Sequence, residues 1–260
     1  MFKLDGFLIL VKMTENTIFK GHGGIVSTAK SCFIQLPYAV VIIVIRFPDI
    51  VGVANMKIMI DLFAGLGGAS QAFWDDPDWS VIRIDNNREL LEHTEGLIIS
   101  DVGNVERTLA IINSFLHVHH GSIKKLVIWA SPPCNQYSFA KMDRDPDNFN
   151  NTLLEAALEI IDALKPNAWI IENVKGAIET FNDIIGLPWC QSVGPVFLWG
   201  QFPQLAFEDA KNRHHKKMLN CGTRKLRPNL RALIPYPISL AYKNCIDYQK
   251  TLFHFVEDLA

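Results

Sequence analysis

Residues 57–70 read KIMIDLFAGLGGAS, and the architecture of the chain can be worked out from there. The stretch begins as a short apolar strand over 57–63 and passes through a glycine-rich turn into a helical stretch that ends near Trp74. A glycine-rich turn between a strand and a helix lets the backbone come close to a ligand and presents the N–H groups of the helix start. The pattern therefore predicts the first strand and helix of an α/β sheet, with a ligand site at the turn.

Strands and helices alternate along the rest of the chain. Short apolar runs predict strands at residues 81–84, 97–99, 126–129 and 168–171. Apolar positions at helical spacing predict helices over 105–118, 153–164 and 239–260. Alternation at this spacing predicts an α/β fold with a doubly wound, mostly parallel sheet.

Each predicted strand ends in a polar or reactive side chain. Asp61 closes the first strand, Asp85 and Asp101 follow the second and third, Cys134 follows the fourth, and Glu172 follows the fifth. In open α/β sheets, ligands bind at the carboxyl ends of the strands. We therefore expect these five side chains to surround one site.

The glycine turn and the two acids after it indicate an adenosine-bearing cofactor. Asp85 lies about 20 residues beyond the turn, where an acid hydrogen-bonds ribose hydroxyls in this type of fold. Asp101 is placed to accept a hydrogen bond from an adenine amino group. No phosphate-binding lysine follows the glycines, which argues against a nucleotide triphosphatase and favours S-adenosylmethionine. The simpler interpretation, in which the glycines only form a tight turn, stays open.

Cys134 follows two prolines at the end of its strand. Proline fixes its own φ and restricts the residue before it, so the cysteine lies on a stiff turn that can present a nucleophile. A thiolate attacks an electron-poor carbon, and a nearby acid must neutralise the charge that appears elsewhere on the same ring. Cytosine fits this pair, with Cys134 adding to ring carbon 6 and a protonated Glu172 at ring nitrogen 3. Alternatively, Cys134 is an inert thiol and Glu172 is a capping or salt-bridged acid.

Three motifs resemble those of the DNA cytosine-5 methyltransferases: DLFAGLGG over 61–68, PCNQYS over 133–138 and ENV over 172–174. The resemblance covers residues 56–174 and implies a Rossmann-like, class I S-adenosylmethionine-dependent methyltransferase. It implies that Cys134 is the nucleophile, that Glu172 is the acid at the base, and that Asn173 positions the catalytic loop. The cofactor residues that it implies are Asp61, Phe63, Ala64, Gly65, Leu66, Gly67, Gly68, Asp85, Asn86, Asp101, Val102 and Pro132.

The second half of the chain departs from that family. Its Gln-x-Arg-x-Arg stretch is absent, and the basic run 211–217 is the candidate substitute for its charge. Its Gly-Asn-Ser-Val segment is replaced by residues 234–241, which keep the shape of a loop entering a helix but lack the Asn-Ser pair. The target-recognition region is reduced, as in the compact versions found in viruses and mobile elements, and restriction-modification is the setting that this suggests.

A basic segment indicates contact with nucleic acid. Residues 211–231 hold eight of the 25 Lys and Arg residues and no acid, which is typical of phosphate contacts, although an ordinary solvated loop is the alternative. A base in double-stranded DNA must leave the duplex to reach Cys134, so we expect base flipping with residues 135–151 as a mobile lid. The predicted nucleic-acid contacts are Ser138, Lys211, Arg213, Lys216, Lys217, Arg224, Lys225 and Arg227.

Composition sets the remaining expectations. The 260 residues are 49% apolar and 20% charged, with a net charge of −2, as in an ordinary globular protein. The five cysteines are widely spaced and form no CxxC pair, which argues against a zinc site or a disulfide framework and favours a reducing, cytoplasmic setting. We expect no metal, no obligate protein partner and a monomer.

The chain divides by composition. Residues 33–45 are almost wholly apolar but too short to span a bilayer, so 1–55 form an extra strand or helix, a membrane-surface segment or a poorly ordered extension. We expect Met56 to be the functional start and 1–55 to be dispensable. The expected domains are a catalytic core over 56–185, a reduced DNA-recognition region over 186–232, and a C-terminal helix over 233–260 that returns to the core.

The function favoured by these patterns is S-adenosylmethionine-dependent methylation of cytosine carbon 5 in DNA. Three alternatives stay open. One is the same chemistry on RNA. Another is methylation of an exocyclic amino group, whose motif ends Pro-Pro-aromatic where this chain has Cys134. The third is a module that binds cofactor or DNA with impaired or no catalysis.

Overall fold

The computed structural model describes residues 2–4, 7–21, 24–36, 39–45, 56–118, 123–206 and 226–248, the first four ranges as backbone only. Those four are strands, which form an antiparallel sheet in the order β1-β2-β3-β4. Their bounds are β1 Phe2–Leu4, β2 Phe7–Gly21, β3 Gly24–Leu36 and β4 Ala39–Ile45. The described ranges of residues 1–55 therefore support the interpretation that this segment adds strands.

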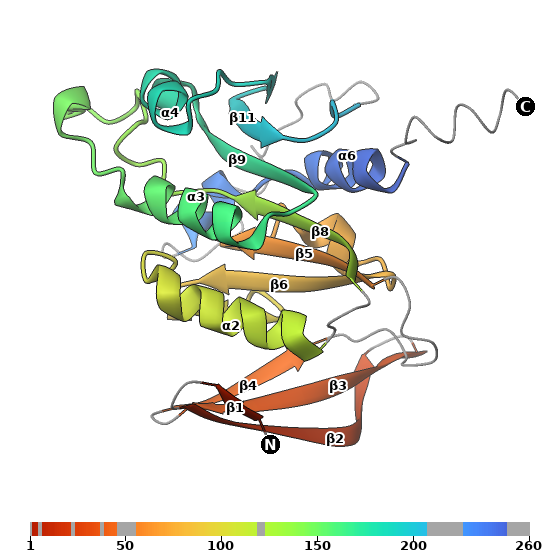
Figure 1. The fold of residues 1–260 in the computed structure, drawn as a ribbon. Coiled ribbons are helices and arrows are strands. Elements are labelled where there is room, and N and C mark those ends of the chain that lie inside the picture. The colour runs from red at the N-terminus through yellow and green to blue at the C-terminus, as the bar shows by residue number, and fades with distance from the viewer. Residues whose placement is uncertain are drawn as a thin grey trace, which may run out of the picture.

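A second sheet of seven strands has the order β10-β11-β9-β8-β5-β6-β7 (Figure 1). The five strands from β9 to β7 are parallel, and β11 and β10 are antiparallel to their neighbours. The predicted doubly wound, mostly parallel sheet is confirmed. The bounds are β5 Met56–Leu62, β6 Trp79–Asp85, β7 Leu97–Ile99, β8 Ile123–Ala130, β9 Ala168–Val174, β10 Gln191–Val193 and β11 Val196–Gln201.

Helices cover both faces of this sheet (Figure 1). Side chains of α2, α3 and α4 join the core on one face, and those of α1 and α6 join the core on the other. The α-helices are α1 Gln71–Trp74, α2 Val105–Val118, α3 Thr152–Leu164, α4 Ile178–Ile185, α5 Arg227–Ala232 and α6 Tyr236–Asp247. Short 3-10 helices lie at Arg88–Leu90, Pro146–Asn148 and Lys175–Ala177.

The predicted helices at 105–118 and 153–164 are confirmed, but the prediction of one helix over 239–260 is wrong within the described residues. The helix begins at Tyr236, because Pro235 supplies the extended residue before it. It ends at Asp247, and Tyr248 is outside the helix. Residues 249–260 lie outside the described part of the chain.

The parallel strands are largely apolar because both of their faces are buried. In β5, Ile58 and Ile60 pack toward α2 and α3, whereas Met59 packs toward α1 and α6. All three are at most 2% exposed. The chain runs outward through β5, β6 and β7 and then returns to β8 beside β5, so the strand order reverses between β5 and β8. Ligands of open α/β sheets bind at such a switch point, which selects the loops after β5 and β8.

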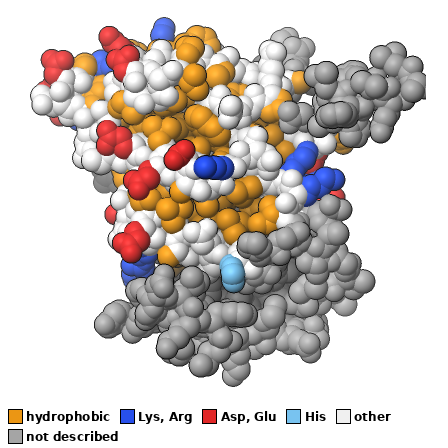
Figure 2. All heavy atoms as spheres, viewed as in Figure 1, with side chains coloured by type: hydrophobic (Ala, Val, Ile, Leu, Met, Phe, Trp, Pro, Cys, Tyr) orange, Lys and Arg blue, Asp and Glu red, His pale blue; other side chains and the backbone are white. Residues whose placement is uncertain are grey.

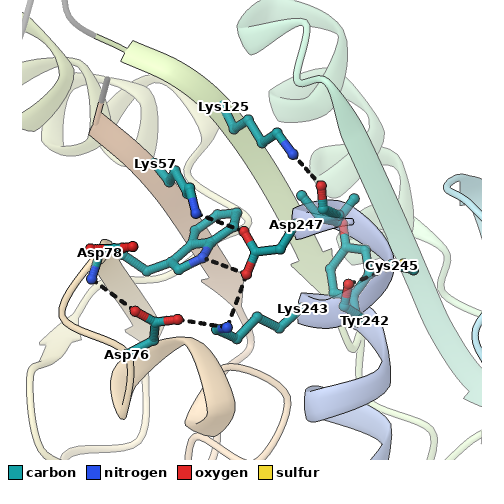
Figure 3. Close-up of polar contacts among 10 residues, drawn as sticks. Lys57, Asp76, Asp78, Lys125, Tyr242, Lys243, Cys245 and Asp247 are labelled. Atoms are coloured by element: carbon teal, nitrogen blue, oxygen red, sulfur yellow. Dashed lines mark hydrogen bonds and ion pairs between the residues drawn. The ribbon is translucent and has the colours of Figure 1, made fainter. Parts of the chain in front are cut away.

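A charge cluster holds the C-terminal end of α6 to the starts of the central strands (Figure 3). Asp247 accepts a hydrogen bond from Lys57 Nζ through Oδ1 (2.8 Å), and from Lys243 Nζ (2.9 Å) and Trp79 Nε1 (3.4 Å) through Oδ2. Lys243 also pairs with Asp76 at 2.6 Å. Burial alone would raise the pKa of Asp247, but the hydrogen bonds from the two lysines outweigh it and hold the pKa below its ordinary value.

Asp247→Asn is expected to lower the free energy of unfolding at pH 7 by about 2 kcal/mol, because the largely buried ammonium group of Lys57 loses its counter-charge and that of Lys243 keeps only Asp76. The lowered pKa places this contribution above pH 3.8, and it is lost as the pH falls below that value. Urea unfolding at pH 7 and at pH 3 measures the difference. Asp78→Asn, at an exposed position beside the cluster, is the control and should change little.

Candidate active site

Three residues with positive φ shape the turn after β5: Phe63 at 59°, Gly65 at 54° and Gly67 at 74°. A bulky side chain in this region is strained, so the surrounding structure must hold Phe63 there. Around Gly65 there is open space, since no heavy atom lies within 4 Å of the position that a Cβ would take. The backbone at Gly65 is therefore accessible to a ligand, as the predicted cofactor site requires.

The other predicted residues of this turn divide by exposure. Leu66 is partly exposed, whereas Ala64, Gly67 and Gly68 are buried. Asp61 is 1% exposed, and burial raises its pKa to about 6. It lies beneath the turn and accepts a hydrogen bond from Ser70 Oγ at 2.5 Å. Asp61 is therefore expected to influence the cofactor site indirectly, through Ser70 and the backbone of the turn.

Asp85 braces the turn from the end of β6. Its Oδ2 accepts the N–H of Gly65 at 2.9 Å, and its Oδ1 accepts the N–H of Asn87 at 2.8 Å. A carboxylate offers about four acceptor positions, so both oxygens can accept further bonds from ribose hydroxyls. Asn86 is exposed at the same strand end. The sequence spacing predicted a ribose contact for Asp85 but did not predict its hydrogen bonds to the backbone of the turn.

A cavity of about 240 Å³ lies beside the turn after β8. Leu153, in its wall, is 3.1 Å from the Cβ position of Gly103, and Asp101 Oδ1 is 3.2 Å from the same point, so one lining side chain lies near the residues that follow β7. Val102 is 2% exposed and belongs to the core. The lining of the cavity mixes apolar side chains with amide groups, which is the composition that an adenosine-bearing ligand requires. The lining residues are Pro132, Pro133, Asn135, Gln136, Tyr137, Asn150, Leu153 and Leu154.

The turn that carries Cys134 is fixed to the strands on both sides. The N–H of Ser131 donates to the carbonyl of Leu62 at the end of β5 (3.1 Å). Asn173, 1% exposed at the end of β9, donates through Nδ2 to the carbonyl of Pro132 at 2.9 Å. The thiol is partly exposed, so a rigid turn presents it at the switch point.

Cys134 and Glu172 interact electrostatically. Burial raises the pKa of the Cys134 thiol, and the negative charge of Glu172 raises it further. Burial also raises the pKa of Glu172 to about 7, while a hydrogen bond with Ser131 lowers it in part. Near neutral pH the carboxyl therefore carries its proton in about half of the molecules. The pair combines a nucleophile with an acid that can donate a hydrogen bond.

The loop of residues 135–151 is closed at its base by side-chain contacts. Gln136 and Asn150 exchange two hydrogen bonds, from Nε2 to the Asn150 carbonyl (2.6 Å) and from the Asn150 N–H to Oε1 (2.8 Å). Next to them, the Tyr137 hydroxyl donates to Asn151 Oδ1 at 2.8 Å. Any movement of the predicted lid is therefore expected in the residues between these contacts.

Arg144 connects the middle of this loop to the exit of β9. It donates from Nε to the carbonyl of Tyr137 (3.2 Å) and from Nη2 to the carbonyl of Gly176 (2.9 Å). Its guanidinium lies over the rings of Phe139 and Phe149, 4.8 and 5.2 Å from their centroids. Gly176 must lack a side chain, because a Cβ there would be 1.9 Å from the Tyr137 carbonyl oxygen. Sequence reasoning missed Arg144, since nothing local distinguishes it from other loop arginines.

Helix α6 closes the glycine turn from the opposite face. A Cβ on Gly68 would be 2.4 Å from the carbonyl oxygen of Ile234, so this approach requires glycine. Ser239, which is fully buried, donates to the carbonyl of Ala69 (2.6 Å) and accepts the N–H of Ala72 (3.0 Å). Because the Asn-Ser pair is absent, the sequence did not show which residue of this segment contacts the glycine turn. In the structure that residue is Ser239, the fourth residue of α6.

Ser239→Ala is expected to lower the free energy of unfolding by about 1–3 kcal/mol, because it leaves buried backbone groups of Ala69 and Ala72 without a partner. Chemical denaturation measures this. Ser114→Ala is the matched helical control, since the Ser114 hydroxyl bonds only to carbonyls of its own helix. It should leave stability unchanged or raise it slightly. Equal stabilities of the two variants would contradict the role given to Ser239.

Two of the eight residues predicted to contact nucleic acid are described. The N–H of Ser138 donates to the carbonyl of Cys134 at 3.1 Å, so Ser138 lies next to the cysteine turn. Arg227 is exposed at the start of α5. Outside the described part of the chain lie Lys211, Arg213, Lys216, Lys217, Arg224 and Lys225.

Among the described residues, the face covered by α2 and α3 shows no gathered basic surface. Figure 2 shows a broad apolar area at its centre, Asp and Glu side chains along the left edge, and scattered Lys and Arg. In the described ranges, no group of three or more His, Cys, Asp or Glu residues is arranged to hold a metal ion. None of the helices described has the length and apolar character needed to cross a bilayer.

Comparison with known proteins adds an independent observation. A family model described as C-5 cytosine-specific DNA methylase matches residues 57–186, which is half of the chain. A solved structure of a methyltransferase from Entamoeba histolytica, EhMeth, is similar at 15% identity and a TM-score of 0.41. That alignment covers 62% of this chain and 57% of the other. No curated protein matches. The matched family segment includes the glycine turn, the Cys134 turn and Glu172.

Proposed function

Because the chain belongs to the C-5 cytosine-specific DNA methylase family, we propose that it methylates carbon 5 of cytosine in double-stranded DNA. The observation that carries this proposal is the pairing of the Cys134 thiol with a carboxyl, Glu172, whose pKa is about 7. S-adenosylmethionine, when bound, supplies an electrophilic methyl group on a sulfonium. Its proposed site is the glycine turn, Asp85 and Asp101, with the cavity beside Pro132.

In the proposed reaction, the Cys134 thiolate adds to ring carbon 6 of the flipped cytosine. Negative charge then develops at ring nitrogen 3, where Glu172 supplies its proton. Carbon 5 becomes nucleophilic enough to accept the methyl group. A base removes the remaining proton from carbon 5, and the bond between Cys134 Sγ and ring carbon 6 breaks. The proton on nitrogen 3 then returns to Glu172. The thiolate and the aromatic ring are thereby restored.

The proton on Glu172 has two effects in this scheme. It makes the carboxyl a donor toward the base, and it removes the negative charge that raises the pKa of the Cys134 thiol. Neutral Glu172 therefore favours the thiolate that must attack. Asn173 is proposed to preserve the geometry, since its bond to the Pro132 carbonyl links the nucleophile turn to the strand that carries the acid.

The remaining parts of the chain take proposed roles around this centre. Residues 56–185 would form the catalytic core, 135–151 the lid, and 211–231 the main phosphate contacts. Strand β11 pairs with β9 and β10 pairs with β11, so most of a recognition region over 186–232 would follow Gln201. Residues 1–55 are proposed to be dispensable for methylation, and the working form is proposed to be a cytoplasmic monomer.

The test is transfer of a labelled methyl group from S-adenosylmethionine to duplex DNA and to tRNA, assayed side by side. The expected result is label on cytosine carbon 5 of DNA and a covalent adduct with DNA that carries 5-fluorocytosine. Label on tRNA alone would assign the chemistry to RNA. Label on an exocyclic amino group without an adduct, or cofactor binding with no transfer at all, would overturn the proposal.

A further inference from the structure

A buried arginine lies beneath the glycine turn. Arg83 belongs to β6 and is 2% exposed. Arginine is almost never fully buried unless its charge and donors are paired, so its partners show what it does. Its guanidinium lies over the ring of Trp74, 4.6 Å from the centroid, which closes one side of its pocket.

The hydrogen bonds of Arg83 converge on the turn and its surroundings. Nε donates to Ser70 Oγ (2.8 Å), and Nη2 donates to the carbonyl of Gly67 (3.4 Å) and to Gln71 Oε1 (3.1 Å). Nη1 donates to the carbonyl of Glu95 at 2.9 Å. One side chain thus connects the turn, the start of α1 and the segment that leads into β7. A planar guanidinium can do this because its five donors point in fixed directions.

Ser70 passes this contact on to Asp61. Its hydroxyl accepts from Arg83 and donates to Asp61 Oδ2 at 2.5 Å. Asp61 and Arg83 are also paired in the register of β5 and β6. The buried carboxylate and the buried guanidinium therefore compensate each other through one hydroxyl, directly under the turn.

The turn packs directly against the guanidinium group of Arg83. A Cβ on Gly67 would be 2.8 Å from Arg83 Cζ. The Thr94 hydroxyl, also buried, donates to the carbonyl of Gly65 at 2.9 Å. In a trans peptide the C=O and N–H groups point in opposite directions. Anchoring the carbonyl of Gly65 from beneath therefore directs the following N–H group, that of the partly exposed Leu66, to the opposite side of the turn.

We propose that Arg83 is a positioning residue for the cofactor, which fixes the glycine turn in its ligand-binding conformation through the Gly67 carbonyl and Ser70. The proposal rests on the proposed function for the identity of the cofactor. Arg83 acts through the turn and touches no reacting atom. Its loss should therefore weaken cofactor binding much more than it slows the step that follows binding.

The experiment measures the dissociation constant of S-adenosylmethionine by calorimetry, with thermal unfolding on the same samples. Arg83→Met keeps the length and apolar stem of the side chain without its donors. It should weaken binding by about 10- to 100-fold, as expected when a ligand contact is displaced by an ångström. Arg83→Lys should be intermediate, because one ammonium cannot reach all four partners. At saturating cofactor, kcat should change by less than about threefold.

Lys57→Met is the matched control. Lys57 is a partly buried cation near the start of β5, at the opposite end of that strand from the glycine turn, and its loss breaks the contact with Asp247. It should lower the melting temperature with the dissociation constant unchanged within about twofold. If Arg83 only stabilised the fold, Arg83→Lys and Lys57→Met would show the same constant as wild type. That result would overturn the proposal. If Arg83→Met does not fold, the measurement on Arg83→Lys still tests the proposal.

The outcomes separate this proposal from the proposed function. Wild-type protein that binds S-adenosylmethionine without methylating cytosine would refute the function, while the Arg83 variants would still decide the role of Arg83. Wild-type protein that does not bind the cofactor would refute both. Weakened binding in the Arg83 variants, with binding in Lys57→Met intact, would support the positioning role.

Discussion

Cys134→Ala is expected to lower the rate of cytosine methylation by about 10⁴-fold or more, because the variant has no atom that can bond to ring carbon 6. The turn should keep its shape, since the hydrogen bonds that fix it come from Ser131 and Asn173 and do not involve the thiol. Single-turnover transfer of labelled methyl groups to duplex DNA measures the rate. Calorimetry with S-adenosylmethionine should give the wild-type dissociation constant.

Two further variants sharpen this test. Cys190→Ala removes an exposed free cysteine outside the turn and should leave the rate unchanged within about twofold. Cys134→Ser keeps a hydroxyl whose pKa is far above that of a thiol, so it should be nearly as inactive as the alanine variant. Methylation by Cys134→Ser at the wild-type rate would show that Cys134 is not the nucleophile.

Glu172→Gln is expected to change the pH dependence of methylation as well as its rate. The reactive form needs a protonated Glu172 and a Cys134 thiolate, and the pKa of Glu172, about 7, lies below that of the thiol. Below pH 7 the acid keeps its proton and the thiolate fraction rises tenfold per unit. Above pH 7 the loss of the proton cancels that rise. The logarithm of kcat/KM should therefore climb with a slope of about 1 and level near pH 7.

In Glu172→Gln the amide remains a hydrogen-bond donor but does not titrate. The break near pH 7 should disappear, so that the rate continues to rise with pH until the thiol is ionised. The maximal rate should fall by about 10²- to 10⁴-fold, because no proton reaches ring nitrogen 3. Glu179→Gln, an exposed acid in the first turn of α4, should keep the wild-type profile. A break near pH 7 in Glu172→Gln would assign that ionisation to another group.

The same variant should be more stable than wild type at high pH. The pKa of Glu172 rises from 4.5 to about 7 in the fold, which corresponds to roughly 3 kcal/mol against the ionised form. This penalty is absent below pH 4.5, grows as the pH rises, and is complete above pH 7. Urea unfolding should show equal stabilities of Glu172→Gln and wild type at pH 4, and a stabler variant at pH 8. No difference at pH 8 would contradict the raised pKa.

Local sequence patterns were sufficient to predict the central strands of the sheet and the motifs that contain Cys134 and Glu172. Strands β5, β6, β8 and β9 are largely apolar because helices bury both of their faces, and this makes them easy to identify in the sequence. The Pro-Pro-Cys turn and the Glu-Asn-Val strand each carry their chemistry within a few neighbouring residues. By contrast, β10 has three residues, and its pairing with β11 depends on contacts that no short window contains.

The supporting residues could not be predicted because their roles depend on distant partners. Arg83 was visible as a charge within an apolar run, yet its purpose depends on Gly67 and Ser70, which belong to another strand and turn. Ser239 is an ordinary helical serine until α6 packs beside Ala69. The prediction of a helix over 239–260 failed at its ends, where Pro235 and the bend at Tyr248 outweigh apolar spacing.

The anchoring of α6 has a consequence for synthesis on the ribosome. Lys57 and Asp247 pair across 190 residues, and the glycine turn receives the Ser239 contact across 170. At about 5–20 residues per second, roughly 10 to 40 s separate the emergence of β5 from that of its covering helix. During this interval the apolar face that α6 covers, which includes Met59 and Trp79, has no permanent cover. The nascent chain should therefore be a client of ribosome-associated chaperones until α6 emerges.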